Sequence, residues 1–209
     1  MDTTTANMIL DAASEVFADK GYDGARINEL AEAAGVNKAT LYYQIGDKEK
    51  LYHSVLIRIM SRFADDIEYA IQDAEDPVVS IRRFIEIFAH QTGNARYISP
   101  ILLREIASGG RHLPDNALEQ MGRVVSNIRK IITDGVDLGI FREVDPFFVH
   151  MLIVGSLNLY AANEPIRKRT SELLKNKHSS HHFDTPDDAA EKLFDLVFAA
   201  IRNPDYPKE

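Results

Sequence analysis

The residues of this chain with the clearest chemical potential lie between Arg26 and Lys48, where cationic, amide, hydroxyl and phenol side chains follow one another closely. Arginine and lysine pair with phosphates, while amide and hydroxyl groups bind base edges in the major groove of DNA. The candidate DNA-binding residues are Arg26, Asn28, Asn37, Lys38, Thr40, Tyr42, Tyr43, Gln44 and Lys48. The alternative is that these residues form an ordinary solvated helix face.

Two short helices and a glycine turn are expected to position these side chains. Apolar residues recur at helical spacing within residues 27–34, which predicts the first helix. Gly35 permits a sharp turn, and Asn37 is a favourable N-cap for a second helix that ends near Ile45. Two helices joined this closely form a helix-turn-helix, whose second helix offers its N-terminal residues to base edges.

A third helix is predicted to begin directly after this motif. Asp47 is a suitable N-cap, and Lys48 follows it in the first turn. Backbone N–H groups and the helix dipole favour a phosphate at such a position. We therefore expect Lys48 to contact the DNA backbone.

The motif belongs to a larger set of residues that recurs in a known family. The set comprises Phe17, Gly21, Tyr22, Leu30, Ala31, Ala34, Gly35, Val36, Thr40, Leu41, Tyr42, Lys48, Glu49 and Leu51. In this order and spacing it resembles the TetR-type bacterial transcriptional regulators. Two positions depart from the family pattern, because Arg26 replaces a capping Thr or Ser and Ile45 replaces Phe. Arg26 offers a phosphate contact in place of a cap, and Ile45 still fills an apolar site.

The resemblance continues at a Gly-x-Phe-Arg-x-x-Asp-Pro segment, residues 139–146. It implies an all-α protein of about nine helices. A three-helix DNA-binding domain is expected at residues 1–50, and a helical domain for effector binding and dimerisation at residues 51–209. The resemblance also implies a homodimeric repressor that binds a near-palindromic operator in double-stranded DNA and is released by a small-molecule effector.

The overall charge bears on how such a protein binds DNA. The 209 residues are enough for one or two domains, and their formal net charge is −8. Within residues 26–50, however, four basic residues balance four acidic ones. We therefore expect weak nonspecific binding and a larger dependence on specific contacts and on dimerisation.

Other classes of protein are not favoured by the sequence. The first residues lack the pattern of a signal peptide, and there is no apolar run of about 18 residues, so we expect a cytoplasmic protein and no membrane. The chain has no cysteine, which excludes disulfides and thiol catalysis. No nucleophile–base pair, phosphate-binding glycine loop or metal triad indicates an enzyme, and no cofactor is expected. A purely structural protein would leave the polar second helix unexplained.

The remaining segments are predicted from periodicity and turn residues. We expect a polar arm at residues 2–5 that is disordered or ordered only on DNA, a long helix at about 48–74, a flexible loop at 109–114 and a polar connection at 164–184. The Arg-Lys-Arg run at 167–169 is interpreted as a solvated helix start and not as a second nucleic-acid patch.

A small-molecule site is expected where polar residues interrupt apolar helices. Convergent polar groups in an apolar pocket are typical of ligand sites, and an arginine suits an anionic ligand. The candidate effector-binding residues are Phe63, Phe88, Gln91, Arg104, Met121 and Asn158. The alternatives are plain core for the aromatic and methionine residues, and surface or helix-capping roles for the polar ones.

Two helices near the C-terminus are expected to form the dimer. The helix at about 146–163 is apolar nearly all round, so we expect one side against its own domain and the other against a second copy. A later helix that begins near residue 186 carries an apolar stripe. The predicted interface residues are Leu157, Leu193, Phe194, Val197, Phe198 and Ile201. The alternative is that this stripe is intramolecular core.

Three histidines, His178, His181 and His182, suggest a metal site as a further alternative. The surrounding segment has no cysteine or carboxylate pattern that would complete a ligand set. No metal is therefore predicted.

Overall fold

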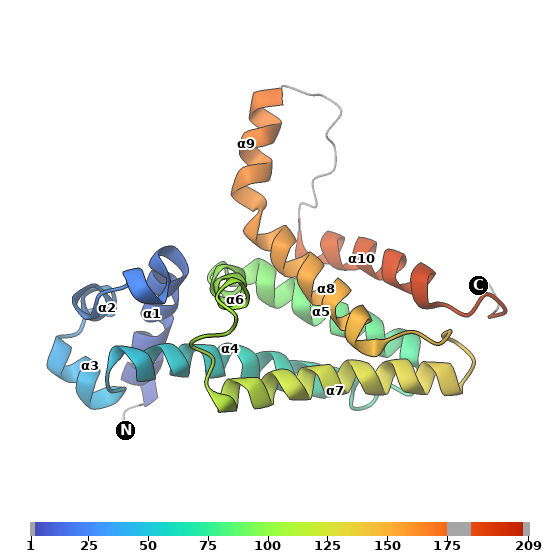
Figure 1. The fold of residues 1–209 in the computed structure, drawn as a ribbon, viewed down its shortest axis with the longest axis horizontal. Coiled ribbons are helices and arrows are strands. Elements are labelled where there is room, and N and C mark those ends of the chain that lie inside the picture. Colours follow the sequence, from blue (N-terminus) through green and yellow to red (C-terminus); the bar gives the residue numbers. More distant parts are fainter. Residues whose placement is uncertain (1–2, 175–184, 207–209) are drawn as a thin grey trace. The chain divides into compact units, whose positions relative to one another are not determined.

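The computed structural model describes residues 3–174 and 185–206, and within them all regular structure is α-helical (Figure 1). The helices are α1 (Thr3–Gly24), α2 (Ile27–Ala33), α3 (Lys38–Gln44), α4 (Lys48–Ile71), α5 (Pro77–Asn94), α6 (Ile98–Ala107), α7 (Asp115–Asp137), α8 (Pro146–Ala162), α9 (Glu164–Leu174) and α10 (Pro186–Ile201). An isolated bridge joins Phe141 to Arg202. The predicted all-α class is confirmed, with ten helices in the described residues where about nine were expected.

The chain packs as two compact units, and α4 and α7 contribute to both. The first unit comprises Met1–Arg62 and Tyr97–Gln120, and the second comprises Phe63–Arg96 and Met121–Glu209. The division into these units reflects packing alone, so the boundary near residue 50 between the DNA-binding and effector-binding parts stays a prediction.

The first unit is built on α1, which packs against α2, α3 and α6. Its core contains apolar residues that are almost completely buried, namely Ile9, Phe17, Leu30, Leu41, Leu51 and Val55. Gly21 interrupts the helical path of α1 with φ of 71°, a value that favours glycine. The expectation of a disordered arm was wrong for residues 3–5, because they continue α1 as its first turn. Asp2 lies outside the described residues.

The second unit is organised around α5, against which α8 and α10 pack (Figure 1). Asp76 accepts a hydrogen bond from Val78 N–H at 2.8 Å, so α5 begins with a side-chain cap directly before Pro77. The Phe63 and Phe88 rings stack with centres 4.4 Å apart. At the start of α10, Thr185 and Asp188 form a reciprocal capping box.

The turn between α7 and α8 brings backbone and aromatic side chains into close contact. Gly139 has φ of 70°, as expected for a helix C-terminus that ends in the left-handed conformation. Gly135, inside α7, packs directly beneath the buried Phe141 ring. Asp145 caps α8 by accepting a hydrogen bond from Phe147 N–H at 2.9 Å.

The structure adds detail to two predicted segments. Residues 164–174 of the polar connection form α9, which contains the helix start predicted at 167–169, and Figure 1 shows α9 extending from the end of α8. Its first turn is stabilised by the Lys168–Glu164 ion pair at 2.6 Å. The loop at 109–114 is tied to α6, because Gly110 N–H donates to the Glu105 carbonyl at 2.7 Å.

Candidate nucleic-acid interface

The turn between α2 and α3 has the geometry that the sequence predicts. Gly35 adopts φ of 65°, and a Cβ atom added at this residue would meet no other atom within 4 Å, so backbone conformation alone favours glycine here. Asn37 caps α3 by accepting a hydrogen bond from Thr40 N–H at 2.8 Å. Leu41 is fully buried and anchors α3 to the core of the first unit. These contacts leave the opposite side of α3 in solvent.

The exposed side of α3 presents two tyrosines. Tyr42 is 50% exposed and Tyr43 is 86% exposed, and both belong to the predicted DNA-binding set. Lys38 is exposed beside them at the start of the helix. Large aromatic side chains in solvent gain little from folding, so their position is consistent with a partner surface.

Other predicted contacts are more constrained. Thr40 is half-buried, and its hydroxyl donates to the Asn37 side chain at 3.1 Å, so it supports the cap. Gln44 is half-buried, and its Oε1 is shielded from solvent and has no hydrogen-bond partner in the described part of the chain. This orientation does not favour a base contact by Gln44.

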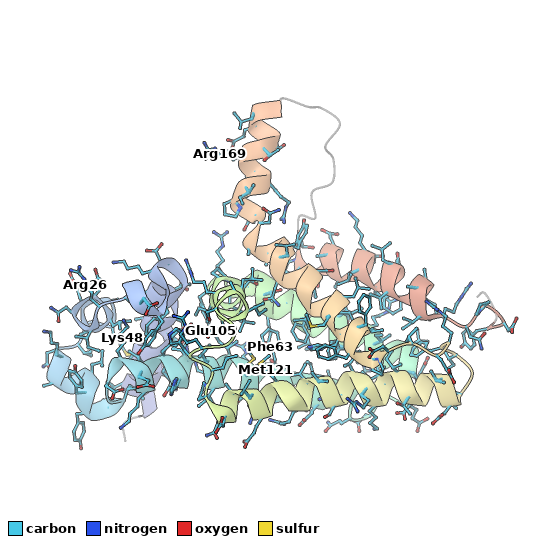
Figure 2. All side chains as sticks on the ribbon, in the orientation of Figure 1. Arg26, Lys48, Phe63, Glu105, Met121 and Arg169 are labelled. Atoms are coloured by element: carbon cyan, nitrogen blue, oxygen red, sulfur yellow. The ribbon has the colours of Figure 1, made fainter. Side chains whose placement is uncertain are left out.

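The N-terminus of α2 carries Arg26 and Asn28, which are both exposed (Arg26 is labelled in Figure 2). The Arg26 side chain does not cap α2. Instead the Glu29 carboxylate accepts the Arg26 backbone N–H at 3.2 Å and pairs with Lys20 at 2.9 Å. These contacts hold the pKa of Glu29 below its usual value, with Lys20 as the larger cause. The Arg26 guanidinium is left on the surface for another partner.

Lys48 lies in the first turn of α4, as predicted. Asp47 caps this helix by accepting from Lys50 N–H at 2.9 Å. The Lys48 ammonium lies 4.5 Å from the centre of the Tyr22 ring and 3.5 Å from the Asp23 carbonyl oxygen. Burial raises the pKa of the Tyr22 phenol, with smaller contributions from Glu49, Asp47 and Asp23, so this ring stays uncharged at neutral pH.

The predicted effector-binding residues of the second unit lie in or beside its core. Phe63, Phe88 and Asn158 are almost fully buried, and Met121 is half-buried. Gln91 is buried and donates to Asp66 at 2.7 Å. An open depression of about 510 Å³ in this unit is lined by other residues, namely Asp66, Tyr69, Ala70, Gln72, Asp73, Arg83, Glu86 and Ile87.

Arg104 does not belong with these residues. It lies in the first unit, where its guanidinium donates to the carbonyl of Ala18 and, at 3.0 Å, to that of Asp19. Both carbonyls belong to the last regular turns of α1 before Gly21. The geometry therefore supports the helix-capping alternative for Arg104, because it satisfies carbonyl groups that the helix end leaves free.

Buried polar groups on α8 add a residue that the sequence analysis missed. His150 is 9% exposed and Asn158 is 1% exposed. Among the described residues, His150 Nδ1 and Asn158 Oδ1 have no hydrogen-bond partner. Burial lowers the pKa of His150, so it is neutral at neutral pH. The only sign of this residue in the sequence was a histidine within a helix that is apolar nearly all round. A buried position in the core explains such a histidine as well as a ligand site does.

The predicted dimer residues are largely internal. Leu157, Phe194, Val197 and Ile201 are each 4% exposed or less within the single chain. Phe194 stacks on Phe198 and lies beneath the Arg82 guanidinium of α5. The prediction that these four side chains meet a second copy was wrong, because α10 packs Phe194, Val197 and Ile201 against its own chain, and Leu157 of α8 is buried within the same chain. Leu193 and Phe198 are half-buried.

A different apolar surface is exposed on α8. It consists of Phe147, Phe148, Met151, Leu152 and Leu159, which are 43–71% exposed. Their spacing places them along one side of the helix, with the small residues Gly155 and Ser156 between them. We call this surface the exposed α8 face. Leu196 of α10 is also 70% exposed.

The described residues provide no other obvious reactive centre. Across residues 3–174 and 185–206, no three His, Asp or Glu side chains come together as a metal-binding group. His178, His181 and His182 lie outside the described residues. Arg167 donates to the Tyr160 carbonyl and covers the Tyr160 ring, which supports a structural role for this arginine. No described helix is both long and apolar enough to cross a membrane.

Comparison with family models gives two matches. Residues 9–55 match the model of bacterial regulatory proteins of the tetR family. Residues 77–182 match the model of the tetracyclin repressor-like C-terminal domain. Together the two matches cover the helix-turn-helix and most of the second unit.

Individual proteins are similar to the chain over much of its length. The HTH-type transcriptional regulator RutR of Escherichia coli is 27% identical over 157 residues, which cover 75% of this chain and 74% of RutR. The HTH-type transcriptional repressor NicS of Pseudomonas putida is 32% identical over 142 residues, which cover 66% of each chain. Both relatives are transcriptional regulators by name.

Solved structures share the fold. The TetR family regulator PfmR from Thermus thermophilus superposes with a TM-score of 0.70 at 26% identity, covering 91% of this chain and 97% of PfmR. FadR from Bacillus subtilis in complex with stearoyl-CoA superposes with a TM-score of 0.70 at 19% identity, covering 94% and 99%. At 19% identity the second likeness is evidence of the fold alone.

Proposed function

The chain belongs to the tetR family of bacterial regulatory proteins, and we propose that it is a dimeric repressor that binds a near-palindromic operator and is released from this DNA by a small-molecule effector. Regulators of this family bind DNA operators and small-molecule effectors and act as dimers. Such a regulator acts in the cytoplasm. The observation that carries the proposal is the exposed side of α3, where Tyr42 and Tyr43 stand in solvent on a helix capped by Asn37.

DNA selection tests the proposal directly. Purified protein is incubated with a random double-stranded DNA library, and bound sequences are amplified and sequenced. We expect a near-palindrome whose half-sites lie one helical turn, roughly 34–36 Å, or a multiple of it apart, because two α3 helices of a dimer enter the major groove on one side. Recovery of no common sequence over repeated rounds would contradict specific DNA binding.

Variants of α3 then connect the selected DNA with the proposed surface. Loss of a base contact costs about 1–3 kcal/mol, so Tyr42→Ala and Tyr43→Ala should each weaken operator binding roughly 5- to 150-fold. Tyr69→Ala is the matched control, because Tyr69 is 76% exposed on α4 but belongs to the second unit. Equal affinity of all three variants and the unmodified protein would place the DNA-binding surface elsewhere.

We propose the exposed α8 face as the dimer interface. Five large apolar side chains in solvent along one helix are costly for an isolated chain and are removed from water when a second copy covers them. Gly155 and Ser156 lie midway along this face, where their small size allows two helices to approach closely. A self-complementary stripe suits a twofold axis, since each copy presents the same surface.

We propose the core of the second unit, at Phe63, Phe88 and Asn158, as the effector site, with His150 added to the predicted set. A buried hydrogen-bond acceptor such as Asn158 Oδ1 costs free energy when no donor faces it, and a donor group of a ligand would satisfy this oxygen. The matching effector is largely apolar and carries a hydrogen-bond donor for Asn158 Oδ1. Gln91 and Met121 remain predicted members of the site, whereas Arg104 does not.

A thermal-shift screen finds such a molecule, because a ligand that binds only the folded state raises the melting temperature. Stearoyl-CoA is one probe in the screen, since FadR of Bacillus subtilis was solved in complex with it. A true effector should no longer raise the melting temperature of the Asn158→Leu variant.

Calorimetric titrations should also show that effector and operator weaken each other's binding by the same factor, typically 5- to 150-fold. Equal effector affinity with and without operator DNA would contradict control by that molecule.

A further inference from the structure

Four side chains beneath Lys48 form a connected cluster in the first unit, and none of them was predicted to contact DNA. They are Tyr22 near the end of α1, Tyr52 on α4, Glu105 on α6 and His112 in the loop that follows α6. Figure 2 labels Lys48, whose ammonium lies over the Tyr22 ring, and Glu105, the buried member of the cluster. The Tyr22 and His112 rings are 4.3 Å apart between centres, and the Tyr22 and Tyr52 rings are 5.2 Å apart.

Glu105 is the buried end of the cluster. Its side chain is only 4% exposed, and a buried carboxylate persists only where hydrogen bonds replace water. The Tyr52 hydroxyl donates to Oε1 at 2.8 Å. The His112 backbone N–H donates to Oε2 at 3.2 Å, and His112 Nδ1 lies 3.1 Å from Oε1. Glu105 therefore holds both the backbone and the imidazole ring of His112 in one position.

His112 transfers this constraint to Tyr22. The imidazole lies against the Tyr22 ring at an interplanar angle of 34°, so the two rings overlap over part of their faces. Tyr22 is half-buried and lies directly after Gly21, where the helical path of α1 is interrupted. Ring contacts with His112 and Tyr52 supply the packing that the interrupted helix does not.

Tyr22 in turn restricts Lys48. A free lysine side chain loses rotamer entropy when it is fixed by a ligand. The attraction between the Lys48 ammonium and the Tyr22 ring, whose centre is 4.5 Å away, restricts the lysine side chain, so part of that ordering occurs before DNA binds. The Asp23 carbonyl takes one donor direction of the ammonium, which leaves the others for a phosphate.

We propose that Tyr22 is a positioning residue for the Lys48 ammonium, and that His112, fixed by the buried Glu105 carboxylate, holds the Tyr22 ring beneath it. The inference rests on the proposed function, because it takes Lys48 as a phosphate contact. It also links the loop between α6 and α7 to the DNA-binding surface, because His112 of this loop packs against Tyr22. A displacement of that loop would release Tyr22 and weaken the phosphate contact.

The test measures how operator affinity depends on salt concentration, using fluorescence anisotropy of the selected operator. Each lost phosphate contact lowers the magnitude of the negative slope of log K against log salt by about 0.9, so Lys48→Gln should lower this magnitude by about 1.8 for a dimer. A lower slope here means a smaller magnitude. Tyr22→Leu should lower the slope in the same direction. In the Lys48→Gln background, Tyr22→Leu should have no further effect, because the group that it positions is gone.

Two further variants separate positioning from folding. Tyr22→Phe keeps the ring face and should retain the slope of the unmodified protein, which a structural role of the hydroxyl would not predict. His112→Ala should lower the slope as Tyr22→Leu does, whereas Arg111→Ala, at the exposed neighbouring position of the same loop, should not. A melting temperature for each variant shows that the fold is retained.

The results distinguish this inference from the proposed function. Additive effects of Tyr22→Leu and Lys48→Gln would overturn the inference and leave operator binding intact. An unchanged slope for Lys48→Gln would overturn it as well, because Lys48 would then contact no phosphate. Failure to select any operator would overturn both.

Discussion

Replacing Phe148 with serine tests whether the exposed α8 face is the surface on which two copies of the chain associate. Phe148 is 71% exposed, the largest exposed fraction among the five apolar residues of this face. Because it contributes little to the core of its own chain, its loss should change the stability of the monomer by no more than about 0.5 kcal/mol. Its loss should, however, weaken the dimer.

The magnitude follows from the exposed fraction. Complete burial of a phenylalanine side chain contributes about 1.5–3 kcal/mol, so burial of the part of Phe148 that is exposed contributes about 1–2 kcal/mol. A twofold interface contains each side chain twice, which gives about 2–4 kcal/mol for the dimer. The dissociation constant of Phe148→Ser should therefore rise roughly 30- to 1,000-fold.

Sedimentation velocity over a dilution series measures this constant. Leu159→Ser, at the other end of the exposed α8 face and 62% exposed, should act in the same direction. Tyr69→Ser is the control and should leave the dimer unchanged, because Tyr69 is 76% exposed but lies on α4. If Phe148→Ser and Leu159→Ser both dimerise as the unmodified protein does, the reasoning from α8 is refuted. Phe194 is unsuitable for this test, because it is 3% exposed and truncating a buried phenylalanine destabilises the fold itself by about 3–5 kcal/mol.

Three further predictions concern folding stability. Gly135→Ala should lower it by about 1–3 kcal/mol in urea denaturation, because the new Cβ would lie 2.0 Å from the buried Phe141 ring, whereas Gly122→Ala on the same helix has open space and should raise it by about 1 kcal/mol. Burial lowers the pKa of His150, so the unfolded chain binds a proton that the folded chain does not; stability should fall as pH drops below about 6.5, and less so in His150→Leu. Thr185→Ala removes the α10 cap and should cost about 1 kcal/mol by thermal denaturation. The first prediction is contradicted if Gly135→Ala and Gly122→Ala change the stability in the same direction. The second is contradicted if His150→Leu has the same stability–pH profile as the unmodified protein, and the third if Thr185→Ala keeps its melting temperature.

Local sequence determined where several helices of this protein begin. Asn37, Asp47 and Asp145 each cap a helix that the sequence predicts, because a capping side chain needs only the backbone N–H groups two or three residues further along the chain. The helix-turn-helix was predictable for the same reason. Its turn depends on the left-handed conformation of one glycine, Gly35, and its exposed side chains follow once Leu41 faces inward.

Contacts between distant segments were not predictable in this way. Arg104 is a long cationic side chain on an amphipathic helix, and only the fold brings it to the carbonyl groups at the end of α1. Glu105, His112 and Tyr22 are separated by up to 90 positions in the chain, since 112 − 22 = 90, yet they form one cluster. No spacing rule connects residues so far apart.

The choice between core and interface was likewise made by the tertiary structure. A helix that is apolar nearly all round, such as α8, carries no periodic signal that distinguishes its inner side from its outer side. A regular apolar stripe, as on α10, shows that a side is buried but not whether its own chain or a second copy covers it. Packing of α5 against α10 covers Phe194, Val197 and Ile201 within the chain and leaves Phe148 in solvent. The sequence by itself determined the helices and the DNA-binding motif, whereas only the packing of whole helices decided which apolar surface remains for a partner.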